Sequence, residues 1–199
     1  MVSEPGPPWR LRGECAIAWI GAVPDDSLPH GFERLPGPSV LIAARYTDSP
    51  VGPYVELAVA RPARRGARFG LCVTTMAVNS SESVAGGRSN WGFPKELSQL
   101  RWRREGHWSS LWSEELGVEV KARPHGPEVP LAAPLWCLQR RADGPVHVPG
   151  RLRGRFRLAG VQADAKASDR LRFVDGHHRG VVVTELRLDV GAARRIGQS

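Results

Sequence analysis

The sequence predicts a mostly β fold, arranged either as a closed barrel or as a sandwich. Two observations support this fold class. The chain contains 22 Gly and 17 Pro residues, which break it at short intervals. The segments between these breaks are rich in Val, Ile, Leu and aromatic residues, as short strands are. The length of 199 residues fits one domain. We therefore expect a single domain over residues 1–199, with a loose leader at 1–10 and a loose tail at 191–199.

The expected elements follow from these segments in chain order. Strands are expected over residues 11–20, 39–46, 54–60, 68–78, 100–104, 109–113, 118–122, 134–141 and 179–190. Residues 24–38 hold four prolines and are expected to form a loop. One short helical turn is expected over 80–85, ended by Gly86 and Gly87. The segment 150–175 gives no clear pattern.

The alternation within the predicted strand 54–60 has a consequence for function. Successive side chains of a strand point to opposite faces. Tyr54, Glu56 and Ala58 are therefore expected on one face of this strand.

The charge of the chain does not point to nucleic acid. The formal net charge is +8, but the basic residues are scattered in small clusters without a recognisable nucleic-acid-binding module. The three cysteines, Cys15, Cys72 and Cys137, stand far apart and predict neither a disulfide framework nor a zinc site. We expect no metal and no cofactor.

No apolar run approaches the 18 residues of a membrane-spanning helix. The N-terminus has an acid and three prolines where a signal peptide needs a basic start and an apolar run. These observations predict a cytoplasmic protein that does not bind membranes.

Lys95 is the most distinctive candidate for chemistry, because only three of the 28 basic residues are lysines. It lies in the segment 86–97 (GGRSNWGFPKEL), where Pro94 favours an extended Phe93 and two aromatic residues offer apolar surface. A lysine in water has a pKa of ~10.4 and is protonated at neutral pH. Burial lowers that pKa and frees the amine to attack a ketone. The alternative is a solvated lysine in a turn.

This segment resembles the signature of the acetoacetate decarboxylase-like family, in which a Gly-Arg pair precedes a Gly/Ala-aromatic-Pro-Lys element. The resemblance implies that Lys95 is the Schiff-base residue, a role for which acetoacetate decarboxylase is itself the usual example. Residues 49–56 (SPVGPYVE) resemble the family's aromatic-X-Glu strand, and Glu56 lies 39 residues before Lys95. The resemblance also implies a closed or conical antiparallel β-barrel and self-association into a homo-oligomer.

The resemblance implies a set of site residues. Lys95 would form the imine and Glu56 would transfer protons. The predicted substrate-binding residues are Arg88, Trp91, Phe93, Met76 and Tyr54. An arginine suits a substrate carboxylate, and a structural ion pair is the alternative for Arg88.

Three positions depart from the family pattern. Glu96 stands where the decarboxylase has a second lysine, although adjacent extended residues point to opposite faces, so that Glu96 is free to point away from Lys95. Leu41 stands where the decarboxylase has a further active-site carboxylate. Arg12 is the nearest candidate for the family's N-terminal arginine.

The first hypothesis is therefore a Schiff-base-forming lyase that acts on a small oxo acid through Lys95, by decarboxylation or by aldol-type or dehydration chemistry. The second hypothesis is a catalytically silent barrel that binds a small molecule and kept only the fold. Glu96 and Leu41 motivate this alternative. A basic accessory protein for nucleic acid is a third and weaker hypothesis.

Overall fold

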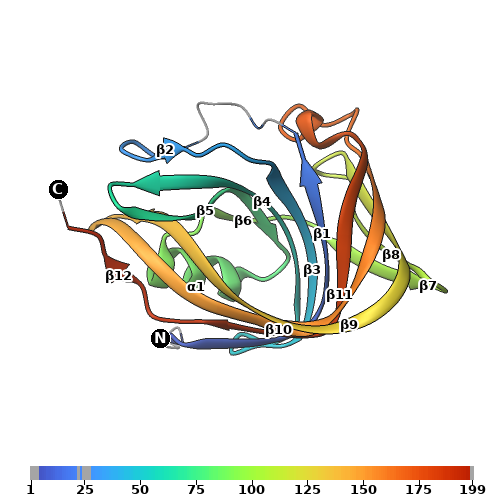
Figure 1. Cartoon of the computed structure of the whole chain (residues 1–199), viewed down its shortest axis with the longest axis horizontal. Helices are drawn as coiled ribbons and strands as arrows, with labels where there is room; N and C mark the ends of the chain where they lie inside the picture. Colours follow the sequence, from blue (N-terminus) through green and yellow to red (C-terminus); the bar gives the residue numbers. More distant parts are fainter. Residues whose placement is uncertain (1–4, 22, 24–27, 198–199) are drawn as a thin grey trace.

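The computed structural model describes residues 5–21, 23 and 28–197. In this part of the chain, a strongly curved sheet of twelve strands accompanies one α-helix and one 3₁₀ helix, which confirms the predicted mainly β class (Figure 1). The strands are β1 (Trp9–Ile20), β2 (Glu33–Arg34), β3 (Ser39–Asp48), β4 (Tyr54–Arg65), β5 (Arg68–Val78), β6 (Lys95–Leu97), β7 (Arg101–Glu105), β8 (Trp108–Ser113), β9 (Val118–Arg141), β10 (Gly144–Asp164), β11 (Gly176–Val190) and β12 (Arg194–Arg195). The helices are α1 (Ser81–Trp91) and η2 (Arg172–Val174).

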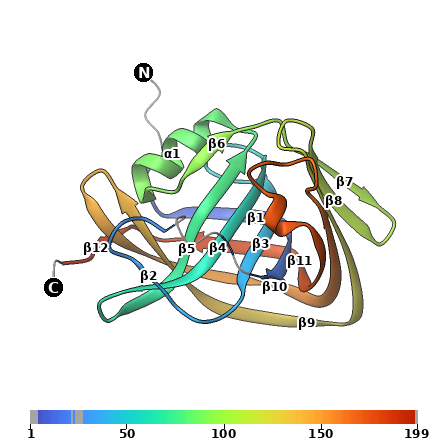
Figure 2. The same ribbon diagram turned by 90° about the horizontal axis from the view of Figure 1, so that it is seen from above.

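The strand pairings return on themselves and enclose an interior. The sheet runs in the order β12-β10-β11-β1-β3-β4-β5-β9-β8-β7, and β9 also pairs with β10. The pairs are antiparallel except where β5 meets β6 and β9. β5 pairs with β9 at a single position, Leu71 with Cys137, whereas β9 and β10 pair along almost their whole length. Figure 2 shows how the strands wrap around the interior from a second side.

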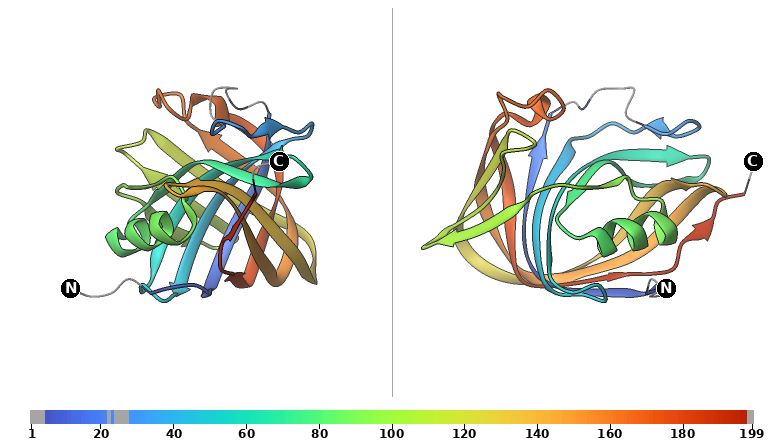
Figure 3. Two further views of the ribbon diagram at one scale, coloured as in Figure 1. Left: turned by 90° about the vertical axis from the view of Figure 1, so that its left-hand side faces the viewer. Right: turned by 180° about the vertical axis from the view of Figure 1, so that it is seen from behind.

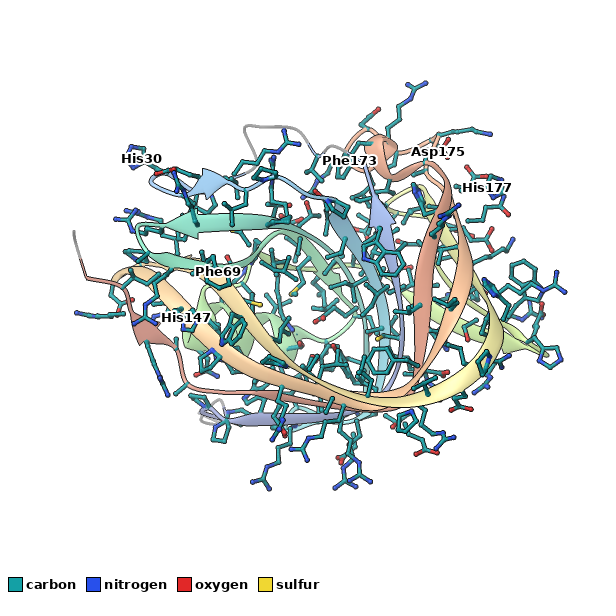
Figure 4. The ribbon with its side chains drawn as sticks, in the orientation of Figure 1. His30, Phe69, His147, Phe173, Asp175 and His177 are labelled. Atoms are coloured by element: carbon teal, nitrogen blue, oxygen red, sulfur yellow. The ribbon has the colours of Figure 1, made fainter. Side chains whose placement is uncertain are left out.

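The sheet buries residues on both of its faces, and the strand alternation sorts them into two clusters. On β1, Cys15 belongs to the cluster that faces the interior, and Ala16 belongs to the cluster on the other face. The cluster that contains Ala16 packs against Phe173 of η2. Figure 4 places Phe173 and Phe69, which lies on β5, at well-separated places in the molecule.

Most of the predicted strands are present, and the main differences lie at the ends of elements. β1 begins at Trp9 within the expected leader, because the Trp9 ring packs edge-on against Trp91 at 5.0 Å. β12 lies within the expected tail and pairs with β10. The expected loop 24–38 contains the two-residue strand β2, while its residues 24–27 lie outside the described part of the chain. The segment 150–175 continues β10 as far as Asp164.

The expected end of the helix at Gly86 and Gly87 is wrong, because α1 continues through both glycines to Trp91. A Cβ atom at Gly86 would lie 2.6 Å from the Trp9 ring, and one at Gly87 would lie 2.5 Å from Lys95 Cδ. The glycines therefore permit close packing and do not end the helix. Figure 3 shows α1 across the opening of the curved sheet. Within the described residues, no helix is long and apolar enough to cross a membrane.

The junction of β5 and β9 gives a testable prediction. A Cβ atom at Gly70 would lie 2.5 Å from the backbone oxygen of Trp136. We expect Gly70→Ala to lower the free energy of unfolding by about 1–3 kcal/mol, because the backbones must separate. Gly160→Ala on β10 is the control, since its Cβ meets nothing within 4 Å. Urea unfolding measures both, and an equal loss in the two variants would contradict the junction's tight fit.

Candidate active site

A cavity of about 170 Å³ lies in the interior of the curved sheet. A cavity of roughly this volume holds a molecule the size of benzene. Its walls are mainly aliphatic and aromatic and come from β1, β3, β4, β5, β9, β10 and β11, together with the end of α1 and the segment that follows it. The side chains that bring hydroxyl, thiol or charged groups to these walls are Cys15, Tyr46, Tyr54, Glu56, Lys95 and Cys137.

Lys95 points into this cavity and is almost fully buried, with 3% of its surface exposed. Its Nζ atom donates hydrogen bonds to Glu56 Oε2 at 2.9 Å and to Ser83 Oγ at 2.8 Å. The Tyr54 hydroxyl lies at the hydrogen-bond limit, 3.5 Å away, and the Tyr54 ring centroid is 5.0 Å from Nζ. The amine therefore has a defined direction within an apolar enclosure.

The backbone around Lys95 is fixed by the turn that ends α1. Gly92 adopts a left-handed conformation with φ 72°, which favours glycine, and its N–H donates to Arg88 O at 2.9 Å. The chain then turns back, so that Lys95 opens β6 in parallel register with Met76 of β5. Arg88 Nε donates to the backbone oxygen of Lys95 at 2.7 Å. Helix, turn and strand thus position the amine together.

Glu56 lies on the cavity face of β4 and is 6% exposed. The predicted shared face of Tyr54, Glu56 and Ala58 is confirmed, because all three line the cavity. Tyr46 donates its hydroxyl to Glu56 Oε1 at 3.4 Å. Burial, and then the Glu56 charge, raise the pKa of Tyr46 well above its usual value. The phenol therefore stays protonated and remains a donor to the carboxylate.

The Lys95–Glu56 pair is the centre of the site's electrostatics. Both charges are removed from water, so each depends on the other, and loss of one partner leaves an uncompensated buried charge. The 2.9 Å contact also gives a direct path for a proton from the ammonium to the carboxylate. A proton can therefore pass between the two groups without leaving the cavity.

The two cavity cysteines do not offer a nucleophile. Burial raises the pKa of Cys15 and of Cys137 to about 12, so both remain thiols at neutral pH.

Four of the five predicted substrate-binding residues line the cavity, namely Tyr54, Met76, Trp91 and Phe93. Arg88 does not, because it is exposed and its side chain is turned to the backbone of Lys95. The structure thus places Arg88 where it supports the site from outside.

The residues at the positions that depart from the family pattern also lie away from the cavity. Glu96 points outward and pairs with Arg170 at 2.7 Å, and this hydrogen bond lowers the pKa of Glu96. Leu41 belongs to the cluster on the other face of the sheet, whereas its neighbours Val40 and Ile42 line the cavity. The assignment of Leu41 to a cavity position is therefore corrected.

Arg12, the candidate for the N-terminal arginine, is exposed and lies 3.8 Å from Asp48. The residues of β1 that line the cavity are Trp9, Leu11, Cys15 and Ile17. None of these side chains carries a positive charge.

Sequence reasoning missed Ser83, Tyr46 and Trp9. Ser83 Oγ accepts a hydrogen bond from Lys95, and the Trp9 ring centroid lies 6.0 Å from Lys95 Nζ. Ser83 precedes Gly87 by four residues and so shares its helix face. That spacing could have revealed Ser83, but only with a predicted helix that continued past Gly86 and Gly87.

Fold and site together define a curved β-sheet protein with an internal lysine held against a carboxylate. Residues 25–124, about half of the chain, match the profile of the family described as acetoacetate decarboxylase. The chain belongs to the acetoacetate decarboxylase family.

Solved structures share the fold. Acetoacetate decarboxylase from Legionella pneumophila aligns with a TM-score of 0.69 and 20% identity, over 99% of this chain and 90% of that one. The enduracididine biosynthesis enzyme MppR complexed with pyruvate aligns at 0.65 with 16% identity, over 96% and 90%. An acetoacetate decarboxylase-like enzyme from Sphingomonas wittichii aligns at 0.63 with 15% identity, over 96% and 92%. A sequence comparison with curated proteins found no match.

The glycine pair in α1 gives a second prediction, since the two glycines face different neighbours. Gly87→Ala would place a Cβ 2.5 Å from the buried stem of Lys95, so we expect a displaced amine and, because its contact with Glu56 weakens, a loss of about 1–3 kcal/mol of stability. Gly86→Ala would push on the rigid Trp9 ring, and we expect it to be destabilising by about 1–3 kcal/mol. Thermal unfolding and the trapping of Lys95 by a carbonyl reagent separate the two effects. A Gly87→Ala variant that traps as well as the unmodified protein would contradict this positioning role.

Proposed function

We propose that this protein is a Schiff-base-forming enzyme in which Lys95 condenses with a small carbonyl compound. The observation that carries the proposal is the buried Lys95 amine, which lies in an apolar cavity 2.9 Å from the Glu56 carboxylate. The carboxylate provides a place for the proton that the amine must give up before it attacks a carbonyl carbon. The family membership supports the same chemistry.

The proposed step balances with groups in the cavity. The Lys95 ammonium gives one proton to Glu56, and the free amine attacks the carbonyl carbon. The resulting carbinolamine takes the proton back from Glu56 and loses water. An iminium ion beside an ionised Glu56 results, with the total charge unchanged. Ser83 Oγ, 2.8 Å from Nζ, accepts a hydrogen bond from the nitrogen and holds its direction.

The iminium ion is an electron sink from which several reactions start. It stabilises the electrons left by a departing carboxylate, and equally those released when a bond to the neighbouring carbon breaks in aldol-type or dehydration chemistry. Glu56 then exchanges a proton with that carbon. The sequence predicts a small oxo acid as substrate, and the pyruvate complex of MppR supports a carbonyl compound of small size.

A ligand-binding barrel without turnover is the second candidate function. One observation favours it: among the described residues, Glu56 is the only carboxylate that lines the cavity. This candidate requires thermal stabilisation by a carbonyl ligand without a covalent adduct on Lys95. The predicted cytoplasmic location, the homo-oligomeric state and the single-domain organisation stay predictions.

The first test of the proposal is reductive trapping at Lys95. With borohydride and a small ketone or oxo acid, we expect a mass increase on Lys95 that is absent from Lys95→Ala. Lys95→Arg should also give none, because a guanidinium does not release its proton. Lys121 and Lys166 are exposed and serve as internal controls. An adduct that persists in Lys95→Ala would overturn the proposal.

The second test removes the proton acceptor. We expect Glu56→Gln to slow trapping by about 10²–10⁴-fold and to destabilise the protein by about 3–5 kcal/mol, because the ammonium loses its buried partner. Glu96→Gln is the matched control. It removes an exposed pair with Arg170 and should cost less than about 1 kcal/mol. Trapping kinetics and urea unfolding measure both effects, and equal results for the two variants would contradict the role of Glu56.

A further inference from the structure

We infer that the substrate is an uncharged carbonyl compound with an apolar chain, and not one of the oxo acids predicted from the sequence. This inference rests on the proposed imine chemistry of Lys95 and narrows it to a substrate class.

The charges in the cavity wall carry the first part of the argument. Among the described residues, Lys95 and Glu56 are the only charged side chains that line the cavity, and they are paired with each other. Arg88 and Arg12 both lie outside the cavity. A substrate carboxylate would therefore meet no free cation in these walls.

Imine formation does not create a site for a carboxylate. The iminium ion keeps the single positive charge of Lys95, and Glu56 remains 2.9 Å from the nitrogen position as its counter-charge. A carboxylate on the substrate would add a second negative charge to an apolar enclosure. A buried charge without a partner is strongly disfavoured. The neutral hydroxyl of Tyr46 is already engaged with Glu56.

The aliphatic part of the cavity wall indicates that the rest of the substrate is apolar. Half-buried aliphatic side chains line the cavity from five strands, namely Ile42, Leu71, Leu135, Leu152, Leu188 and Val190. A ligand with an apolar chain would cover them and remove them from water. The volume of about 170 Å³ fits a ligand of roughly six to nine non-hydrogen atoms.

This substrate class also selects the reaction. An uncharged ketone has no carboxylate to lose, so the iminium ion serves to break or form a bond to the neighbouring carbon. In the cleavage direction, Glu56 takes the hydroxyl proton of a β-hydroxy ketone held as its iminium ion. The carbon–carbon bond breaks and an aldehyde leaves. The electron pair of the broken bond forms an enamine with the imine nitrogen. Glu56 returns the proton to the enamine carbon, and water hydrolyses the new iminium ion to release a ketone and restore the Lys95 ammonium beside an ionised Glu56.

The test compares two probes of equal shape that differ in charge. Full-length protein is trapped with borohydride in the presence of 6-methylheptan-2-one or of 5-oxohexanoate, and pyruvate is a third probe. We expect the yield of Lys95 adduct with the ketone to exceed that with either acid by at least about tenfold at equal concentration. Adduct yields with an acid that equal or exceed the ketone's would overturn the substrate class and leave the imine chemistry standing. No adduct on Lys95 with any probe would overturn the proposed function and this inference with it.

A gain-of-function variant tests the charge argument directly. Leu152→Arg places a cation on the half-buried part of the cavity wall, where its head group can stay in contact with water. We expect the ratio of 5-oxohexanoate adduct to ketone adduct to rise by about tenfold. Leu152→Gln is the control for size and polarity, and its ratio should rise less than that of Leu152→Arg, because an amide carries no charge. An unchanged ratio in Leu152→Arg, with circular dichroism showing an intact fold, would contradict the inference.

Discussion

The buried pair of Lys95 and Glu56 is the constraint on which the rest of the site depends. Two charges held in an apolar interior need each other, and the fold supplies their contact at 2.9 Å from two elements that are distant in sequence. β4 brings the carboxylate, while the turn after α1 brings the amine. Buried pairs of this kind contribute little net stability. The presence of this pair in a mainly apolar cavity is therefore better explained by chemistry than by folding.

Packing around the pair is close, and small residues make it possible. Gly86 and Gly87 let α1 approach Trp9 and Lys95 to distances that a side chain would block. Gly92 lets the chain reverse after α1, so that Lys95 comes back beside Ser83 of that helix. Gly86 and Gly87 are unfavourable in the interior of a helix, whereas Gly92 suits its left-handed turn. Tertiary contacts compensate for that local cost at the site.

The sequence was most informative where a feature depends on neighbours along the chain. Alternation placed Tyr54, Glu56 and Ala58 on one face, and the aromatic residues before Lys95 do line the same cavity. The sequence was least informative where contacts with distant segments determine the end of an element or the face on which a residue lies. Gly86 and Gly87 suggested a helix end, because the residues that pack against them, Trp9 on β1 and Lys95 on β6, lie on other elements. The side of β3 on which Leu41 lies depends on register, and a slip of one residue exchanges the two faces.

Arg88 belongs to the segment 86–97 that resembles the family signature, but its role is to hold the backbone. Its guanidinium holds the main chain of Lys95 at 2.7 Å and stands outside the chamber in which a ligand would sit. In this chain the arginine of the signature belongs to the architecture of the lysine's backbone and supplies no charge to the cavity. Substitutions among the aliphatic residues that line the cavity from the strands could therefore change which molecule fits, while the backbone that carries Lys95 stays in place.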